Sequence, residues 1–154
     1  MYQWLVFAHL VGLVFFAMCH GVSIFSAFRI RSMRDTAAIR GQLELTTQSS
    51  RLMYIGLILL AVGGIGAASS ANLWGATWIT WSIVVFIAVI VTMYAVASSY
   101  YYPLRDLVNG KDGAPPAEGE ALAKALDTRR PELLLAIGGG GLLILIWLMV
   151  LKPA

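Results

Sequence analysis

The chain has 154 residues, of which 59% are hydrophobic and only 12% are charged, and its formal net charge is +3. A soluble domain carries about twice that charged fraction, so the composition excludes an ordinary soluble enzyme or binding domain. The basic pI of about 9.2 does not indicate a nucleic-acid partner, because the basic residues follow the pattern expected for orientation in a membrane.

Four apolar segments are long enough to cross a membrane as helices. They cover residues of about 4–28, 52–71, 77–101 and 133–151. A helix of about 20 apolar residues crosses a hydrocarbon core of about 30 Å, and lipid cannot satisfy an exposed backbone, so each segment is expected to be helical. The sequence therefore predicts an all-α fold, a four-helix transmembrane bundle in which residues 1–154 form a single integral membrane domain.

The basic residues predict how this bundle is oriented. Ten of the eleven Lys and Arg residues fall in the connections 29–51 and 102–132, and the exception is Lys152. The positive-inside rule makes those two connections cytoplasmic loops and places both termini on the non-cytoplasmic side. We therefore expect a multi-pass protein of the bacterial cytoplasmic membrane, with both termini periplasmic or extracellular and the lipid bilayer as its first partner.

The two cytoplasmic loops are expected to hold short surface structure. Asp35 and Thr36 can cap a helix from about residue 37 to 46, separate from the second span. The second loop begins at Pro103 and continues as a turn-rich linker over 109–116. Residues 118–130 then read as a short amphipathic helix.

Small residues mark faces where helices can approach closely. The second segment presents Gly56, Gly63 and Ala67 as one stripe, and the fourth holds four consecutive glycines, 138–141, with Ala136 and Gly140 forming a small-xxx-small pair. Each of these glycines costs the helix about 1 kcal/mol relative to Ala. Close backbone packing would offset that cost, and so would a planar cofactor or a partner helix bound to the helix face that the glycines leave without side chains.

Among the Asp, Glu, Lys, Arg and His residues of the chain, only His9 and His20 fall inside the predicted spans, both on the first segment. Such residues are functional candidates by default. Eleven residues at about 100° each bring the two to within about 20° of one another, about 16 Å apart along the axis. Two interpretations stay open: neutral imidazoles that hydrogen-bond a neighbouring helix, or axial ligands of haem b.

A haem held within one chain would need a second ligand, because no third histidine exists. Met149, near the level of His9, and Met93, nearer the level of His20, are the candidates, and another subunit could also supply one. The spans contain no carboxylate for a proton relay or for cation exchange. We predict no metal site other than haem iron and no catalytic residue.

Two resemblances add to this interpretation. The pattern Trp4-x4-His9-Leu10-x-Gly12, followed by Val14 and Phe15-Phe16-Ala17, resembles the first helix of HemJ-type protoporphyrinogen oxidases and the related CopD-like membrane proteins. That resemblance implies haem binding at His9. HemJ-type enzymes also use a lysine in a later helix, which the later spans here lack, so it implies haem binding without the enzymatic activity. The ending 148–153 resembles a family of uncharacterised bacterial four-helix integral membrane proteins.

Two functional expectations follow. The first is a non-catalytic membrane subunit that packs against a larger respiratory or photosynthetic electron-transfer complex through its glycine-rich faces. The second is a b-type haem-binding four-helix membrane protein that ligates haem through His9 and, as a further candidate, His20. The two are compatible, because a haem could lie at the interface with another membrane subunit.

Overall fold

The computed structural model describes residues 1–111 and 115–153, and this part of the chain forms five helices and no strand. The helices are α1 (Tyr2–Arg31), α2 (Thr36–Ser70), α3 (Thr77–Asn109), α4 (Gly119–Leu126) and α5 (Arg130–Leu151). Helices α1, α2 and α3 and the region formed by α4 and α5 are long and apolar enough to cross a membrane. The predicted all-α arrangement of four long helices is confirmed, and by helix length and composition the chain is a multi-pass membrane protein.

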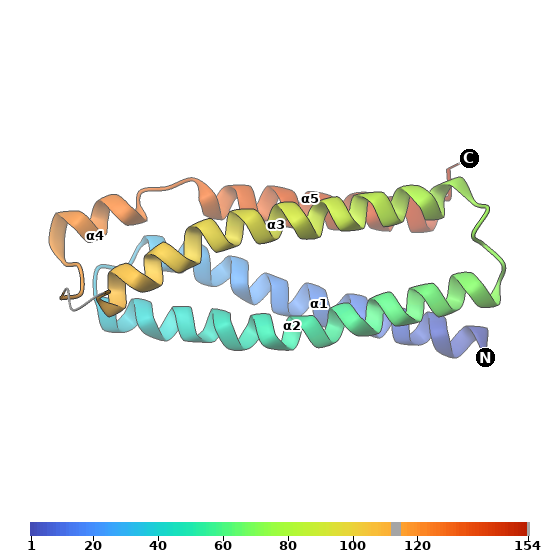
Figure 1. Cartoon of the computed structure of the whole chain (residues 1–154), viewed down its shortest axis with the longest axis horizontal. Helices are drawn as coiled ribbons and strands as arrows, with labels where there is room; N and C mark the ends of the chain where they lie inside the picture. Colours follow the sequence, from blue (N-terminus) through green and yellow to red (C-terminus); the bar gives the residue numbers. More distant parts are fainter. Residues whose placement is uncertain (112–114, 154) are drawn as a thin grey trace.

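The four long helices lie side by side as two pairs (Figure 1). Helix α1 packs extensively along α2, and α3 packs along α5, whereas contacts between the two pairs are sparse. Both termini lie at one end of the bundle, here called the termini end, and α4 lies at the opposite end, the α4 end (Figure 1). In the same view α1 and α2 cross each other, so a stripe on α1 can meet different neighbours at its two ends.

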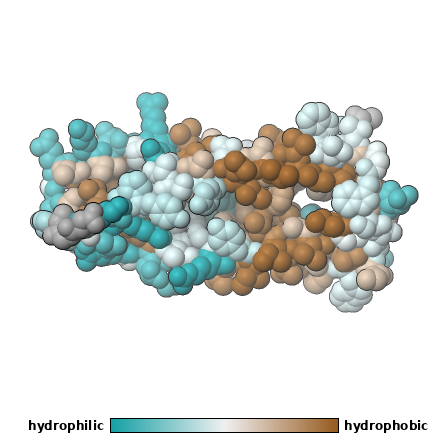
Figure 2. All heavy atoms as spheres, in the orientation of Figure 1, coloured by the Kyte–Doolittle hydropathy of each residue, from teal (hydrophilic) through white to brown (hydrophobic). Residues whose placement is uncertain are grey.

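The surface changes in character between these two ends. Hydrophilic side chains gather at the α4 end, and hydrophobic ones cover much of the long helices towards the termini (Figure 2). Large apolar side chains point outward there, among them Leu143 at 69% exposure and Val150 at 70%. Lipid removes the free-energy cost that such exposure would carry in water. The buried core lies towards the α4 end and consists of Ala27, Ile30, Ile39, Leu43, Tyr100, Leu104, Val108, Leu122, Leu126 and Leu134.

Helix α2 is longer than the sequence analysis predicted. The Asp35 carboxylate caps it as expected, accepting from the backbone N–H groups of Ala37 and Ala38 at 3.2 and 3.1 Å. The helix does not end near residue 46, however, but continues without a break into the second span. Side chains in this polar stretch bond backward within the helix: the Thr46 hydroxyl donates to the Gln42 carbonyl at 2.9 Å. Most of the expected loop 29–51 is therefore helical.

Helix α3 also continues past its expected end, because Pro103 lies inside it. A proline within a helix removes one backbone hydrogen bond and costs about 3 kcal/mol. Tertiary contacts beyond the proline oppose that cost: Leu104 and Val108 are buried, and the Arg40 guanidinium donates to the Val108 carbonyl at 2.7 Å. The prediction that a loop begins at Pro103 was therefore wrong.

The amphipathic helix expected over 118–130 is shorter than predicted. It is α4, and its two leucines, Leu122 and Leu126, are each 1% exposed. The backbone N–H of Ala117, just before α4, donates to the carbonyl of Leu107 at 2.9 Å and so ties the connection to α3. Residues 112–114 of the expected turn-rich linker lie outside the described residues.

Candidate functional site

The imidazole of His9 is held against the backbone of α2. Its Nδ1 atom lies 2.7 Å from the carbonyl oxygen of Leu60. A carbonyl can only accept, so the neutral ring carries its proton on Nδ1 and leaves Nε2 as the acceptor. Gly64 provides the space for the ring, because a Cβ atom at that position would lie 2.8 Å from Nδ1. His9 itself is half-buried.

Three glycines allow α1 and α2 to approach so closely. A Cβ on Gly12 would lie 2.3 Å from the backbone nitrogen of Leu60, and one on Gly63 would lie 2.5 Å from that of His9. A Cβ on Gly56 would lie 2.7 Å from the backbone nitrogen of Phe16. Backbone atoms in two packed helices cannot move aside as a side chain can, so these positions admit only glycine.

The second histidine, His20, is buried between α1 and α5. Its exposure is 8%, and its ring stacks on that of Phe16, with centroids 5.8 Å apart and an interplanar angle of 12°. Its Nε2 atom has no hydrogen-bond partner among the described residues. The ring projects into the space left by Gly138, where a Cβ atom would lie 2.1 Å from Nε2. Gly138 is therefore required for His20 to fit.

The glycine run of α5 is divided between two faces of the helix. Gly138 admits His20, and Gly141 admits Val89 of α3, whose Cγ2 would lie 2.4 Å from an added Cβ. A Cβ on Gly139 would meet only Leu135 of the same helix, at 3.7 Å, and one on Gly140 would meet no atom within 4 Å. Close packing therefore explains the inward glycines, Gly138 and Gly141. It does not explain the outward ones, Gly139 and Gly140.

The structure does not bring the four candidate haem ligands together as one site. His9 contacts α2 and His20 contacts α5, because α1 crosses α2 and its histidine stripe passes from one neighbour to the other (Figure 1). Met93 packs against the buried core at the α4 end, and Met149 is half-buried near the end of α5. Within residues 1–111 and 115–153, no group of three or more His, Cys, Asp or Glu side chains could hold a metal ion.

The two histidines differ in how they could accommodate a haem. An axial ligand needs open space at one ring nitrogen for the iron and the porphyrin plane. At His20, Nε2 faces the backbone of α5 at Gly138 and has no such space. At His9, Nδ1 is taken by Leu60, and only Nε2 remains. The residues present do not fit a haem held inside the bundle by His20, and at His9 the one ring nitrogen left to ligate iron is Nε2.

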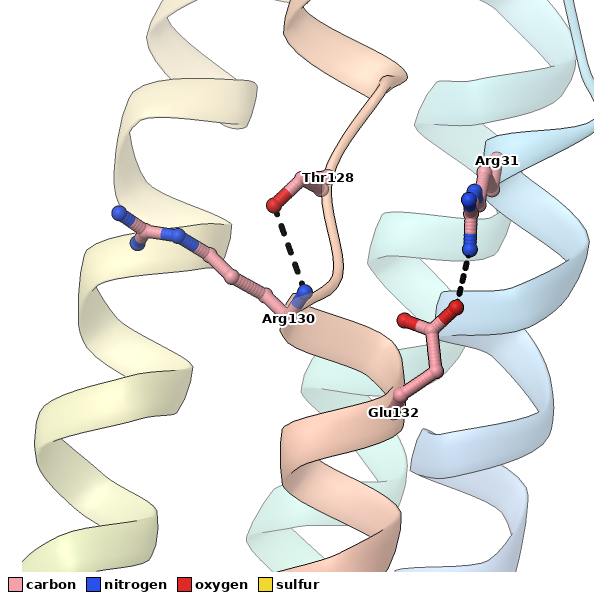
Figure 3. Close-up of polar contacts among 4 residues, drawn as sticks. All are labelled: Arg31, Thr128, Arg130 and Glu132. Atoms are coloured by element: carbon pink, nitrogen blue, oxygen red, sulfur yellow. Dashed lines mark hydrogen bonds and ion pairs between the residues drawn. The ribbon is translucent and has the colours of Figure 1, made fainter.

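A network of polar side chains at the α4 end was not anticipated from the sequence. Arg31, at the end of α1, forms an ion pair with Glu132, at the start of α5 (Figure 3). The pKa of the Glu132 carboxyl, which precedes the apolar part of α5, is lowered by a hydrogen bond from its own backbone N–H and further by Arg31. The Arg105 guanidinium also donates to the Thr47 hydroxyl, across from α3 to α2. The sequence feature that could have predicted these contacts is the presence of charged residues just outside spans that face each other.

Comparison with family models, with curated proteins and with solved structures finds no match to this chain. The likeness of the first helix to HemJ-type and CopD-like proteins, and that of the ending to a four-helix family, therefore stay predictions.

Proposed function

We propose that the chain is a non-catalytic membrane subunit that packs through the outer face of α5 against another chain of a larger membrane complex. The division of the glycine run supports this proposal. The helix-propensity cost of Gly138 and Gly141 is offset by contacts within the chain, whereas Gly140 faces open space. A glycine in a helix costs about 1 kcal/mol relative to Ala, and a helix from another chain, packed against Gly140, would offset that cost.

The outer face has the character of a helix-packing surface. Ala136, Gly140 and Ile144 follow one another at four-residue spacing, and Ala136 and Ile144 are exposed. Association of helices in lipid depends on close backbone approach, which small residues at this spacing permit. The partner that fits this face is an apolar spanning helix. The respiratory or photosynthetic electron-transfer complex expected from the sequence stays a prediction about that partner's identity.

We also propose that the protein lies in the bacterial cytoplasmic membrane with the α4 end in the cytoplasm. The support is the distribution of basic residues, because Lys152 is the only one beyond the two connections at the α4 end. At the termini end, the Lys152 ammonium lies 5.6 Å from the centroid of the Trp78 ring. A tryptophan ring at this level suits a membrane–water interface.

Purification in a gentle detergent tests the subunit proposal. The wild-type chain should bring down a second membrane protein in a fixed molar ratio. Gly140→Leu should lose that protein while keeping its own thermal stability, because the position is open within the chain. Gly21→Leu is the matched control, since Gly21 on α1 is equally open, and it should retain the partner. Recovery of the wild type as a lone or merely self-associated bundle would contradict the proposal.

A second candidate function, haem binding at His9, is favoured by the bond between Nδ1 and the Leu60 carbonyl. Histidines that ligate metals usually donate their other ring N–H to a carbonyl or carboxylate, which fixes the tautomer and the ring orientation. His9 is arranged in this way at 2.7 Å. A haem b at the interface would take its second axial ligand from the partner chain, and the two proposals would then describe one assembly.

The visible absorption spectrum of the gently solubilised protein tests this second candidate. A Soret band and a reduced α-band should be present in the wild type and in His20→Ala, and absent in His9→Ala. If expression with ample haem yields no Soret band, or if His9→Ala keeps an unchanged spectrum, His9 is not a haem ligand.

A further inference from the structure

A pocket of about 390 Å³ lies at the α4 end, where α3, the end of α4 and the start of α5 meet. Tyr100, Pro103 and Leu107 line it from α3, and Lys124 lines it from α4. The remaining wall is the connection between α4 and α5, which reaches the pocket through Asp127 and continues to Arg130 at the first position of α5. Two cationic side chains and one carboxylate thus surround the space, which leaves it with a net positive charge.

Arg130 is the most informative of these residues. Its side chain extends from the start of α5 towards α3 (Figure 3), and it lines the pocket. Its Nη1 atom is shielded from solvent, yet it has no hydrogen-bond partner among the described residues. A buried guanidinium N–H without an acceptor is costly, because the group has lost water and gained nothing. An anionic acceptor in the pocket would remove that cost.

The Thr128 hydroxyl adds a further donor at the same pocket. The Thr128 hydroxyl oxygen already accepts from the backbone N–H of Arg130 at 3.3 Å, and its own hydrogen stays available to an acceptor. The donors outnumber the one opposing carboxylate, Asp127.

The position of the pocket along the bundle suggests where its ligand comes from. The apolar stretch of α3 ends near residue 101, so Tyr100 and Pro103 lie at the depth where the hydrocarbon core gives way to lipid headgroups. Leu104 and Leu107 give the pocket an apolar wall as well. A ligand with a phosphate beside a hydrocarbon chain matches both the donors and this wall.

We propose that this pocket binds the phosphodiester of an anionic phospholipid, with Arg130 and Lys124 as its cationic contacts. Arg130 supplies a planar guanidinium suited to two phosphate oxygens, and Lys124 supplies a flexible point charge at the mouth of the pocket. The Thr128 hydroxyl donates to a third oxygen. The lipid would hold α3, α4 and α5 together at the membrane surface. This inference does not depend on the proposed subunit role.

Native mass spectrometry of the detergent-solubilised chain tests this site with phosphatidylglycerol as the probe and phosphatidylcholine as the neutral comparison. The wild type should retain one phosphatidylglycerol molecule in preference to phosphatidylcholine. Arg130→Gln should weaken that binding roughly tenfold to a hundredfold, as expected for a charge-assisted bond. Lys124→Gln should weaken it about fivefold, the value of one basic residue near a membrane surface.

The matched control is Arg129→Gln, because Arg129 is the exposed neighbour of Arg130 and does not line the pocket. Arg129→Gln should leave the preference for phosphatidylglycerol over phosphatidylcholine unchanged. Lys124 is exposed, so its variant keeps the test decisive even if Arg130→Gln fails to fold. Equal loss in all three variants would overturn the site. Binding of inorganic phosphate that depends on Arg130, without retention of phosphatidylglycerol, would overturn the lipid as the source.

Discussion

The ring of His20 occupies the space that a side chain on Gly138 would need, with its Nε2 atom 2.1 Å from the position of a Cβ at that residue. The ring cannot easily move away, because it is buried and stacked on Phe16. The pair joins α1 to α5, and contacts between the two helix pairs are otherwise sparse. This contact therefore helps to hold the two pairs together, with the shared core and the Arg31–Glu132 ion pair at the α4 end.

Gly138→Ala should destabilise the bundle for this reason. Forcing an extra carbon into a packed site costs about 1–3 kcal/mol, which exceeds the gain of about 1 kcal/mol in helix propensity. Thermal unfolding in detergent, followed by circular dichroism, measures the change. Gly140→Ala is the control, and it should be neutral or slightly stabilising because its surroundings are open. A Gly138→Ala variant as stable as Gly140→Ala would show that the His20 contact is not tight.

The α1–α2 contact should be still less tolerant of substitution. An added Cβ on Gly12 meets backbone atoms at Leu60 and Gly56, and one on Gly56 meets the backbone of Phe16. Either substitution to Ala must separate the helices over several turns, so each should lower the unfolding temperature more than Gly138→Ala does. Combined, the two should cost less than their sum, because the first already separates the helices. Gly41→Ala, at an open position of α2, should cost nothing, and fully additive losses would contradict a shared contact.

The ion pair between Arg31 and Glu132 should make stability depend on acidity at low pH. The folded pKa of Glu132 lies below its ordinary value of 4.5, so the folded state holds the carboxylate more strongly than the unfolded chain does. Its contribution is therefore complete above pH 4.5 and is lost as the pH falls through the folded pKa. Both side chains are more than one-third exposed, so solvent screening keeps the effect small.

Unfolding temperatures of the wild type and Glu132→Gln, measured from pH 7 down to pH 3, test this dependence. The wild type should be the more stable at neutral pH, and the difference should shrink in the acid range. A difference that stays constant over the whole range would show that the carboxylate charge contributes nothing.

Hydropathy correctly predicted four long apolar helices, but it could not predict where these helices end. An apolar stretch reports the part of a helix that suits lipid, and a helix can continue beyond it into water. In α2 the Thr46 hydroxyl forms its hydrogen bond to the Gln42 carbonyl within the same helix. In α3 the burial of Leu104 and Val108 outweighs the free-energy cost of Pro103. Both outcomes depend on contacts with other helices, which one sequence does not display.

The histidines show the same limit at the level of a site. Spacing predicted that His9 and His20 share one stripe of α1, but the angle at which α1 crosses α2 decides which helix each one meets. That angle is set by the close approach at Gly12, Gly56 and Gly63. The role of Gly138 as the space for His20 likewise requires the registry of α5 against α1. The polar contacts around Glu132 depend on both the crossing angle of α1 and α2 and the registry of α5 against α1.

Photo-crosslinking from the outer face of α5 in native membranes tests the central claim, that Gly140 lies against another chain. A benzophenone amino acid at Ile144, which is 49% exposed, should give one discrete adduct with a single membrane protein, and Gly140→Leu in the same chain should abolish it. The same probe at Ile87 of α3, which is 55% exposed, should give no such adduct. Identical products from both positions, or an adduct at Ile144 that survives Gly140→Leu, would contradict the claim.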